Sequence, residues 1–424
     1  MKIDILLGLQ WGDEGKGKVV DVLTPRYDAV ARFQGGPNAG HTLEFDGNKY
    51  VLRSIPSGVF NHGAINIIGN GVVLDPILFA EEAQALESSG VNLHTNLVIS
   101  SKAHIILPTH RLLDAASESS KGTRKIGTTG KGIGPAYTDK VSRGGMRVGD
   151  LLMPDFKERY HNITEAHFEA LKRMGATVDR NTLARTEKQW LEAVEYLRGF
   201  NIEDTSYLVN DLLASHKRVL CEGAQGTMLD IDFGSYPFVT SSNTVSAGAC
   251  SGLGVAPNKV GDVYGIFKAY CTRVGQGPFP TELFDDNGRR MRDIGHEYGA
   301  VTGRERRCGW LDLPALKYAV MVNGVTKLIM MKSDVLDTFD TIRVCRAYNV
   351  DGLITDRLPF SLETEVTPVY QDFEGWKTNL SAAKSPDDFP EPFKRYIRFI
   401  EEQTGVPVVI VSVGPDRTQT IELS

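Results

Sequence analysis

Residues 10–21 read QWGDEGKGKVVD and follow an apolar run, Ile3–Leu9. The run predicts a strand, and the residues after the loop are compatible with a helix. A strand, a glycine loop and a helix N-terminus in this order place backbone N–H groups where they can bind phosphate oxygens. Gly12, Gly17 and Lys18 match the G-x-x-x-x-G-K spacing of a phosphate-binding loop. The segment therefore predicts a nucleotide site.

The same loop carries side chains that could take part in a reaction. Asp13 and Lys16 lie inside it, whereas Val19 stands where such loops usually carry a magnesium-binding Ser or Thr. Cations near a helix start are disfavoured unless an anion binds there, which favours ligand roles for Lys16 and Lys18 over two solvated lysines. An Asp beside a glycine turn is more often a cap or turn residue. The local sequence thus leaves the role of Asp13 open.

A second nucleotide signal lies at Met331–Asp334, after the apolar run Leu328–Met331. The tetrapeptide MKSD is similar to the N/T-K-x-D element that selects guanine in GTP-binding proteins. A carboxylate at Asp334 can accept hydrogen bonds from N1–H and the 2-amino group of guanine, which adenine cannot offer. Met331 departs from the usual Asn or Thr. Taken alone, the tetrapeptide is more often a simple strand-end turn.

Bulk properties restrict the class of protein. The chain has 424 residues, 41% of them hydrophobic and 24% charged, with a net charge of −6. This balance argues against broad binding to nucleic acid or anionic membranes. Five widely spaced cysteines support neither a disulfide framework nor a zinc site. No run approaches the ~18 apolar residues of a membrane helix, and the chain opens at once with a strand, so we expect a cytoplasmic protein.

The elements that must position these residues can be read from short apolar runs bounded by glycine. Most runs are continuous, as in strands buried on both faces of a parallel sheet. They are Ile3–Leu9, Ala29–Phe33, Ile65–Ile68, Val219–Cys221, Leu328–Met331 and Val408–Val413. Helix-like stretches such as Asp75–Ser88 and Leu311–Val322 lie between them. The alternation predicts a three-layer α/β fold with a mostly parallel central sheet and helices on both faces.

Two segments depart from this pattern. Residues 155–216 are rich in Glu, Lys, Arg, Leu and Ala and predict a helical insertion. Residues 121–149 are dense in glycine between basic residues and predict a mobile binding loop. We expect residues 1–424 to form a single domain, similar to P-loop nucleoside triphosphatases (NTPases), that carries this insertion.

Ten segments in the same order resemble the adenylosuccinate synthetase family, and they cover nearly the whole chain. They are QWGDEGKGK, GGPNAGHT (35–42), IPSG (55–58), IGTTGKGIGPAY (126–137), EGAQGTMLDID (222–232), YPFVTSSNT (236–244), TRVGQGPFPTEL (272–283), TGRERRCGWLD (302–312), MKSDVLD (331–337) and VGPDRTQT (413–420). The resemblance implies a GTP-dependent ligase that joins IMP to L-aspartate, with Mg²⁺ as cofactor and GDP and phosphate as products.

That reaction must replace the oxygen on C6 of the purine, which is a poor leaving group. Phosphorylating the oxygen activates it, and this requires a base for the N1 proton and a donor at the transferring phosphoryl group. The resemblance implies that Asp13 is the base and that His41 hydrogen-bonds the phosphoryl group. A lone His after glycine is otherwise more often an ordinary surface residue. Because Val19 offers no hydroxyl, the resemblance assigns magnesium to Asp13 and the carbonyl of Gly40.

The resemblance also implies four overlapping sets of site residues. The catalytic set is Asp13, Lys16, His41 and Gln225. The GTP set is Gly12, Asp13, Glu14, Gly15, Lys16, Gly17, Lys18, His41, Thr42, Arg306, Lys332, Ser333, Asp334, Ser412, Val413 and Gly414. The IMP set is Asp13, Lys16, Asn38, Ala39, Gly40, His41, Thr129, Arg143, Gln225, Thr240 and Arg304. The aspartate set is Ala300, Val301, Thr302, Gly303, Arg304 and Arg306.

The arginines of residues 299–309 are the candidates for a dicarboxylate, since a planar guanidinium matches a carboxylate better than an ammonium does. Arg304, Arg306 and Arg307 all qualify, although clustered arginines are often only a solvated face. Val301 replaces the Thr of some relatives and removes one possible hydroxyl contact. The charge of Glu305 must point away from the substrate carboxylates.

The sequence also bears on the quaternary structure and on one rival function. The resemblance implies a homodimer in which Arg143 reaches the IMP of the other subunit, although the sequence equally allows an ordinary surface arginine. The rival is a regulatory GTP-binding switch protein. Such a protein needs neither GGPNAGHT nor the arginine loop, and it should keep the Ser or Thr that is missing at Val19.

Overall fold

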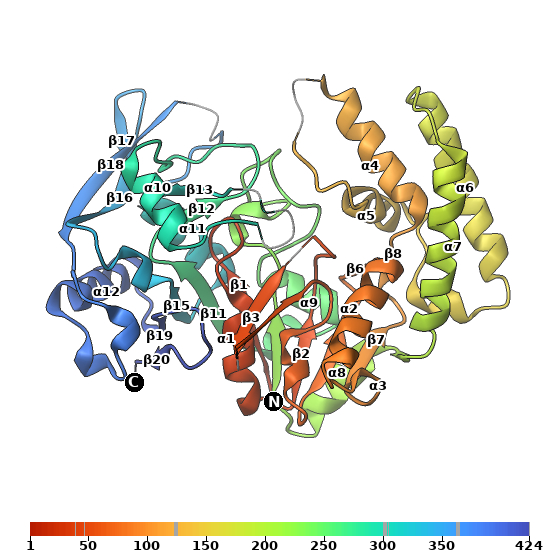
Figure 1. Cartoon of the computed structure of the whole chain (residues 1–424), viewed down its shortest axis with the longest axis horizontal. Coiled ribbons are helices and arrows are strands. Elements are labelled where there is room, and N and C mark those ends of the chain that lie inside the picture. The colour runs from red at the N-terminus through yellow and green to blue at the C-terminus, as the bar shows by residue number, and fades with distance from the viewer. Residues whose placement is uncertain are drawn as a thin grey trace.

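The computed structural model describes residues 1–38, 40–45, 47–122, 126–299, 303, 305–361 and 365–423. Its centre is a ten-stranded sheet with helices on both faces (Figure 1). In spatial order the strands are β20 (Thr420–Glu422), β19 (Val408–Ser412), β15 (Lys327–Met331), β11 (Val260–Lys268), β1 (Ile3–Gly8), β10 (Val219–Glu222), β2 (Ala29–Arg32), β5 (Ile65–Ile68), β7 (Leu97–Ser100) and β9 (Asn201–Glu203). The predicted fold class is confirmed.

Neighbouring strands of the central sheet are parallel, except that β20 pairs antiparallel with β19. The helices are α1 (Lys16–Leu23), α2 (Pro76–Ser88), α3 (Leu93–Asn96), α4 (Pro108–Ser120), α5 (Ile133–Ser142), α6 (Phe156–Arg173), α7 (Arg180–Leu197), α8 (Thr205–Ala214), α9 (Ala247–Leu253), α10 (Asp286–Ile294), α11 (Leu313–Asn323) and α12 (Glu391–Thr404). Parallel strands place all their carboxyl ends at one edge of the sheet, where loops can form a site.

Both faces of the sheet are buried, which explains the continuous apolar runs. In β1, Leu6 belongs to the cluster that contains Val19 and Val20 of α1. Its neighbours Ile5 and Leu7 belong to the opposite cluster, which contains residues of α8, α9, α11 and α12. This alternation follows from the two-residue period of a strand. Each fully buried Leu or Ile contributes roughly 1.5–3 kcal/mol to the hydrophobic stabilisation.

Smaller sheets surround this core. They comprise the hairpin β3 (His41–Phe45) and β4 (Asn48–Leu52), the pair β6 (Val73–Leu74) and β8 (His104–Ile105), and the pair β12 (Cys271–Arg273) and β13 (Arg307–Gly309). A four-stranded sheet contains β14 (Leu311–Asp312), β16 (Thr341–Val350), β17 (Leu353–Thr355) and β18 (Val366–Glu374). The hairpin is important for function because it begins at His41 and packs against α1.

Two segmental predictions need correction. The insertion at residues 155–216 is helical through α6, α7 and α8, but Asn201–Glu203 forms β9 and extends the central sheet beside β7. The glycine-dense segment 121–149 is not one loop, because α5 occupies Ile133–Ser142. Figure 1 shows α4, α5, α6 and α7 together at one end of the molecule. Among the described residues, no helix is both long and apolar enough to cross a membrane.

Candidate active site

The predicted site residues gather at the carboxyl edge of the central sheet. The phosphate loop follows β1, Gln225 follows β10, the MKSD element follows β15, and Ser412 ends β19. Asp13, Gln225 and Lys332 each adopt positive φ, at 60°, 58° and 56° respectively. This backbone region is sparsely populated by non-glycine residues, and such residues cluster at functional sites.

The phosphate loop is shaped by Glu14, whose buried carboxylate faces the loop interior. Its Oε1 accepts hydrogen bonds from the backbone N–H groups of Gln10 at 3.1 Å and Gly12 at 3.0 Å. Its Oε2 lies 2.5 Å from Nζ of Lys16. The ammonium of Lys16 also donates to the carbonyl oxygen of Gln225. The side chain of Glu14 therefore holds the loop and Lys16 in place. A bound anion must then be held by other backbone N–H groups.

Helix α1 offers those amides directly. Its N-cap, Gly15, has φ 97°, and no side chain caps the helix. The first N–H groups of an uncapped helix can bind phosphate oxygens. Gly17 is needed for a close approach, because a Cβ at this position would lie 2.9 Å from the Cβ of His41. The helix N-terminus and His41 are thereby brought together.

His41 forms a buried pair with Glu222, the last residue of β10. Its Nδ1 lies 2.5 Å from Oε1 of Glu222, which also accepts from the hydroxyl of Ser57. Although burial opposes it, His41 and then Arg32 hold the pKa of Glu222 below its usual value. Burial, followed by the charge of Arg32, lowers the pKa of His41. A neutral imidazole beside a carboxylate carries its proton on Nδ1.

The other nitrogen of His41 is left available to a ligand. Nε2 is buried and has no hydrogen-bond partner among the described residues. Buried polar atoms without a partner are rare in folded proteins. The Nε2 atom is therefore a candidate contact for a bound phosphoryl group.

The ammonium of Lys18 is bonded to the segment after β19 and not to the phosphate loop, where the G-x-x-x-x-G-K spacing predicts it. Lys18 is the third residue of α1, and its Nζ donates to Oγ of Ser412 at 2.8 Å, the carbonyl of Gly414 at 2.7 Å and the carbonyl of Gln419 at 3.0 Å. Burial lowers the pKa of Lys18 to about 8, although Asp334 and then Asp416 oppose this. The lysine thus joins α1 to the loop after β19.

The same loop forms a wall beside the MKSD element. Oγ of Ser333 donates to the carbonyl of Ser412 at 2.9 Å. Burial raises the pKa of the Asp334 carboxyl. Its Oδ1 is buried without a partner in the part of the chain that the structure describes. Val413 and Gly414 follow directly after β19, so the two predicted segments of a guanine pocket lie together.

Arg306 connects the phosphate loop to a buried carboxylate. Its Nε lies 2.8 Å from Oδ2 of Asp13, and its NH1 lies 2.6 Å from Oε2 of Glu297. Glu297 is fully buried and also contacts Lys268 at 2.8 Å and Lys332 at 3.1 Å. Although burial opposes it, these cations, first Lys268, hold the pKa of Glu297 well below its usual value. One carboxylate therefore positions groups from three segments of the chain.

The IMP candidates converge from three further loops. Nε2 of Gln225 donates to Oδ1 of Asn38 at 3.1 Å. In the glycine segment that contains the exposed Thr129, Nζ of Lys131 donates to the carbonyl of Pro37 at 2.8 Å. Thr240 is half-buried, and its backbone N–H donates to Leu229 at 2.9 Å. These contacts bring Asn38, Gln225 and the glycine segment to one side of the phosphate loop.

Other predicted residues have less direct placements. Gly40 immediately precedes β3, and Thr42 lies within it. Gly303 has φ 63°, and its N–H donates to Gly299 at 2.7 Å. Arg143 is exposed at the C-terminus of α5. The predicted residues that lie outside the described part of the chain are Ala39, Ala300, Val301, Thr302 and Arg304.

Two charges of the arginine loop have defined partners. Arg307 is occupied, because its Nε donates to Oε1 of Glu282 at 2.8 Å and its NH1 to the carbonyl of Gly277 at 2.7 Å. Arg307 is thus poorly placed to bind a dicarboxylate, although its sequence position made it a candidate. Oε2 of Glu305 lies 3.2 Å from NH1 of Arg292, so its charge is paired with this arginine.

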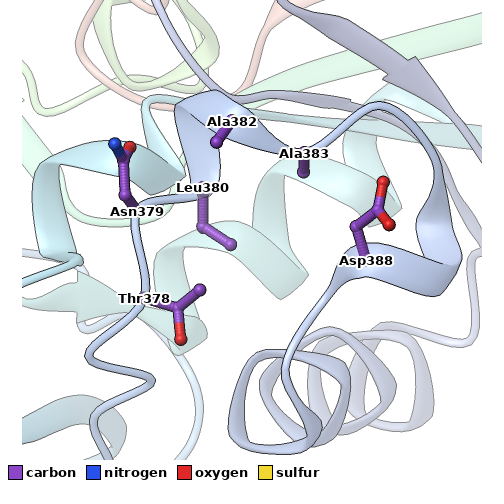
Figure 2. A pocket seen from close by; sticks show the side chains of 6 residues that line it. All are labelled: Thr378, Asn379, Leu380, Ala382, Ala383 and Asp388. Atoms are coloured by element: carbon purple, nitrogen blue, oxygen red, sulfur yellow. The ribbon is translucent and has the colours of Figure 1, made fainter.

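Sequence reasoning did not single out Glu222, Glu297 or Lys268. Glu222 and Lys268 could have been found in the sequence, because each is a charged residue at the end of an apolar strand. Figure 2 shows a pocket in a different region, lined by the segment that connects β18 to α12 along the chain. It is lined by Thr378, Asn379, Leu380, Ala382, Ala383 and Asp388. This lining offers no cation, so the pocket is not suited to a nucleotide phosphate.

These features define a nucleotide-dependent group-transfer enzyme. A glycine loop and an uncapped helix follow the first strand of a wound sheet, a buried His–carboxylate pair lies beside them, and Asp334 is placed as in guanine-binding proteins. Comparisons with known proteins identify the family. The family model for adenylosuccinate synthetase matches residues 5–421. Adenylosuccinate synthetases of Phocaeicola vulgatus and Bacteroides thetaiotaomicron are each 66% identical over 422 residues, covering 100% of this chain and 99% of theirs.

A solved structure agrees. The fully ligated adenylosuccinate synthetase of Plasmodium falciparum is 38% identical, with a TM-score of 0.90 over 100% of both chains. The chain belongs to the adenylosuccinate synthetase family. The predicted function, GTP-dependent ligation of IMP and L-aspartate in purine biosynthesis, is confirmed. Nothing supports the alternative of a regulatory switch protein.

Proposed function

We propose that the enzyme activates IMP by phosphorylating O6 and that Asp13 is the base. Asp13 takes the N1 proton, O6 attacks the γ-phosphorus of GTP, and the bond from that phosphorus to the bridging oxygen of GDP breaks. The amine of aspartate then attacks C6, and phosphate leaves with the former O6. The half-exposed carboxylate of Asp13 on a strained loop supports this role.

His41 stabilises the transferring phosphoryl group in this proposal. Glu222 keeps a proton on Nδ1, which directs Nε2 toward the ligand. In this role the imidazole must also carry a proton on Nε2, which the negative charge of a bound triphosphate favours. Nε2–H then donates as charge shifts onto the phosphoryl oxygens. Lys16 supplies a second cation, and Gln225 with Asn38 holds IMP beside it.

Magnesium is proposed to bind the carboxylate of Asp13 and the carbonyl of Gly40. Within the phosphate loop, Glu14 is occupied by amides and Lys16, whereas Asp13 remains partly exposed. Oxygen donors of this kind suit Mg²⁺. When bound, the ion supplies positive charge to the phosphate oxygens of GTP. Arg306 must release Asp13 for this, and the incoming aspartate carboxylate gives its guanidinium a new partner.

The remaining ligand contacts follow the loops. We assign the guanine base to Asp334, with Ser333 and the segment 412–414 as the pocket wall. Lys18 acts indirectly by holding that wall. Thr129, Thr240 and Arg304 bind IMP, and residues 300–304 with Arg306 bind aspartate. The active form is proposed to be a cytoplasmic homodimer in which Arg143 reaches the IMP of the other subunit.

The contact of Lys16 with Gln225 carries this proposal, because it joins the phosphate loop to the proposed IMP loop. Phosphate release from GTP should be measured with IMP and aspartate present together, singly and not at all. Rapid release is expected only when both are present. GTP hydrolysis that does not depend on IMP would contradict the proposed coupling.

A further inference from the structure

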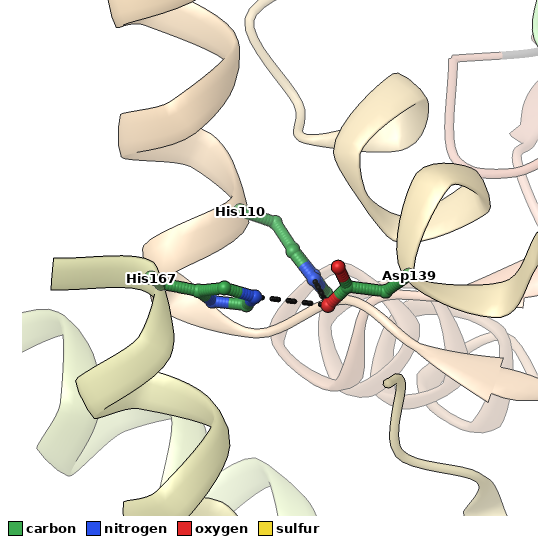
Figure 3. A group of neighbouring side chains, drawn as sticks. All are labelled: His110, Asp139 and His167. Carbon is green, nitrogen blue, oxygen red and sulfur yellow. Dashed lines mark hydrogen bonds and ion pairs between the residues drawn. The ribbon is translucent and has the colours of Figure 1, made fainter. Parts of the chain in front are cut away.

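Three helices at one end of the molecule meet in a buried polar cluster, His110–Asp139–His167 (Figure 3). His110 belongs to α4, Asp139 to α5 and His167 to α6. Both Nε2 atoms lie 2.9 Å from the same oxygen, Oδ2 of Asp139. Although burial opposes it, the hydrogen bonds from the two histidines hold the pKa of Asp139 well below its usual value. The cluster thus contains a carboxylate held by two imidazoles.

The arrangement is suggestive of a metal site, but the hydrogen bonds argue against one. The backbone N–H of Leu107 donates to Nδ1 of His110 at 2.9 Å. A nitrogen that accepts from an N–H group cannot itself carry a proton, so the proton of a neutral His110 is on Nε2. A histidine binds a metal through a lone pair. Nε2 of His110 therefore donates its proton to Asp139 and is not free to bind a cation.

The main chain of Asp139 has a separate task. Its carbonyl oxygen accepts hydrogen bonds from the N–H groups of Gly144 at 2.9 Å and Gly145 at 3.2 Å. These bonds close the turn that ends α5, and Arg143 lies in that turn with φ 66°. A non-glycine residue persists in this conformation only when its surroundings enforce it. Asp139 thus fixes the turn through its backbone and anchors α5 through its side chain.

We propose that the His110–Asp139–His167 cluster positions Arg143 for use by the neighbouring subunit. The cluster ties the helical insertion, through α6, to the helix that presents this arginine. The cluster does not contact the reacting groups. It acts on the active site of the partner subunit through Arg143. This inference rests on the proposed shared site, in which Arg143 acts in trans.

Asp139→Asn is the primary test, because an amide oxygen has no charge and accepts more weakly than a carboxylate oxygen from the two imidazole N–H groups. We expect the KM for IMP to rise about 10- to 100-fold through misplacement of Arg143, with the KM for GTP unchanged. Asp211→Asn is the matched control, since Asp211 is exposed on α8. The double variant Asp139→Asn/Arg143→Leu should be no worse than Arg143→Leu alone, as expected for residues that act together.

Mixing chains separates action in trans from action within one subunit. An Asp139→Asn chain mixed with an Asp13→Asn chain forms heterodimers with one complete site. That site uses the Asp13 of the first chain and the correctly held Arg143 of the second. Equal mixing should restore about a quarter of wild-type activity at an IMP concentration near the wild-type KM, because half the dimers are mixed and half their sites complete. Subunit exchange is verified by mass tags.

An Arg143→Leu chain mixed with the same Asp13→Asn chain is the reference. If the reference recovers and the Asp139→Asn mixture does not, the cluster does not act through Arg143 and the inference is overturned. If neither recovers, the shared site itself fails and the inference falls with it. An unchanged KM for IMP in the Asp139→Asn homodimer would also overturn it.

A second variant keeps the test valid if Asp139→Asn does not fold. His167→Gln retains an N–H donor and should preserve the KM for IMP, whereas His167→Leu should raise it. Co²⁺ alone serves as the probe for a metal. Stoichiometric Co²⁺ binding that is lost in His110→Gln would contradict the hydrogen-bonded cluster described above.

Discussion

Oδ2 of Asp13 lies 2.8 Å from Nε of Arg306. The proposed base therefore starts in an ion pair with a residue that we assign to aspartate and GTP binding. Burial opposes it, but the carboxylates of Asp13 and then Glu297 raise the pKa of Arg306, so this guanidinium stays charged. Because Glu297 holds Arg306 from the other side, Arg306 can leave Asp13 without losing all its charge partners.

Asp13→Asn should abolish most product formation and leave the fold intact. The change is nearly isosteric, but it removes the base, and loss of a general base typically costs about 10²–10⁴ in rate. Steady-state turnover and a circular dichroism melting curve measure the two expectations. A well-folded variant with more than half of wild-type turnover would rule out Asp13 as the base.

His41→Asn should lower turnover far more than it weakens GTP binding, since its contact strengthens as charge shifts in the transition state. Glu222→Gln should follow in the same direction, with a loss on the order of 10² in turnover, because the imidazole loses the carboxylate that orients it and stabilises its protonated form. Ser57→Ala is the control, since it removes one bond to Glu222 and keeps its charge. A raised KM for GTP with normal turnover would make His41 only a binding residue.

Asp334→Asn should change the choice of base. The amide can present an NH₂ group where the carboxylate only accepts, so xanthine nucleotides should gain relative to GTP. Loss of a matched polar contact costs about 1–3 kcal/mol, or roughly fivefold to 150-fold in selectivity. The ratio of kcat/KM for GTP and XTP measures this. A ratio equal to that of the wild-type enzyme would remove Asp334 from the base pocket.

The sequence indicated much of the fold because the central strands are buried on both faces. Their apolar runs could be read directly, as could the helix-like stretch Asp75–Ser88 that contains α2. It did not show β9, a three-residue edge strand whose pairing with β7 depends on tertiary context. It also did not show α5, because the surrounding glycines lower the helix propensity of this segment. Helix propensity cannot reveal that Asp139 is anchored by two histidines distant in sequence.

Candidate site residues such as Asn38 and Gln225 were expected from the resemblance to the family and not from the strand pattern. Asn38 and Gln225 are 187 positions apart, and their contact follows from parallel strand ends. The orientation of Lys18 could not be predicted, because its partners at residues 412–419 are set by the pairing of β15 with β19. The roles of Glu222 and Glu297 depend on which side chains face them, and a single sequence does not contain that information.

GTP binding should weaken as the pH rises through about 8. Burial lowers the pKa of Lys18 to about 8, so below this pH the ammonium donates to all three of its acceptors, and above it one donor is lost. The wall of the guanine pocket should then loosen and the KM for GTP rise. Lys18→Arg, which does not titrate in this range, should lack the step near pH 8. The same pH dependence in both proteins would assign the step to another group.

Transfer of the purine oxygen tests the central claim most directly. The enzyme should be given IMP that carries ¹⁸O at C6, together with GTP and aspartate, and the released phosphate analysed by mass spectrometry. If O6 attacks the γ-phosphorus before the amine displaces it, every phosphate formed with adenylosuccinate should carry the label. Phosphate without ¹⁸O, formed in equal amount to the product, would contradict phosphorylation of IMP and with it the roles proposed for Asp13 and His41.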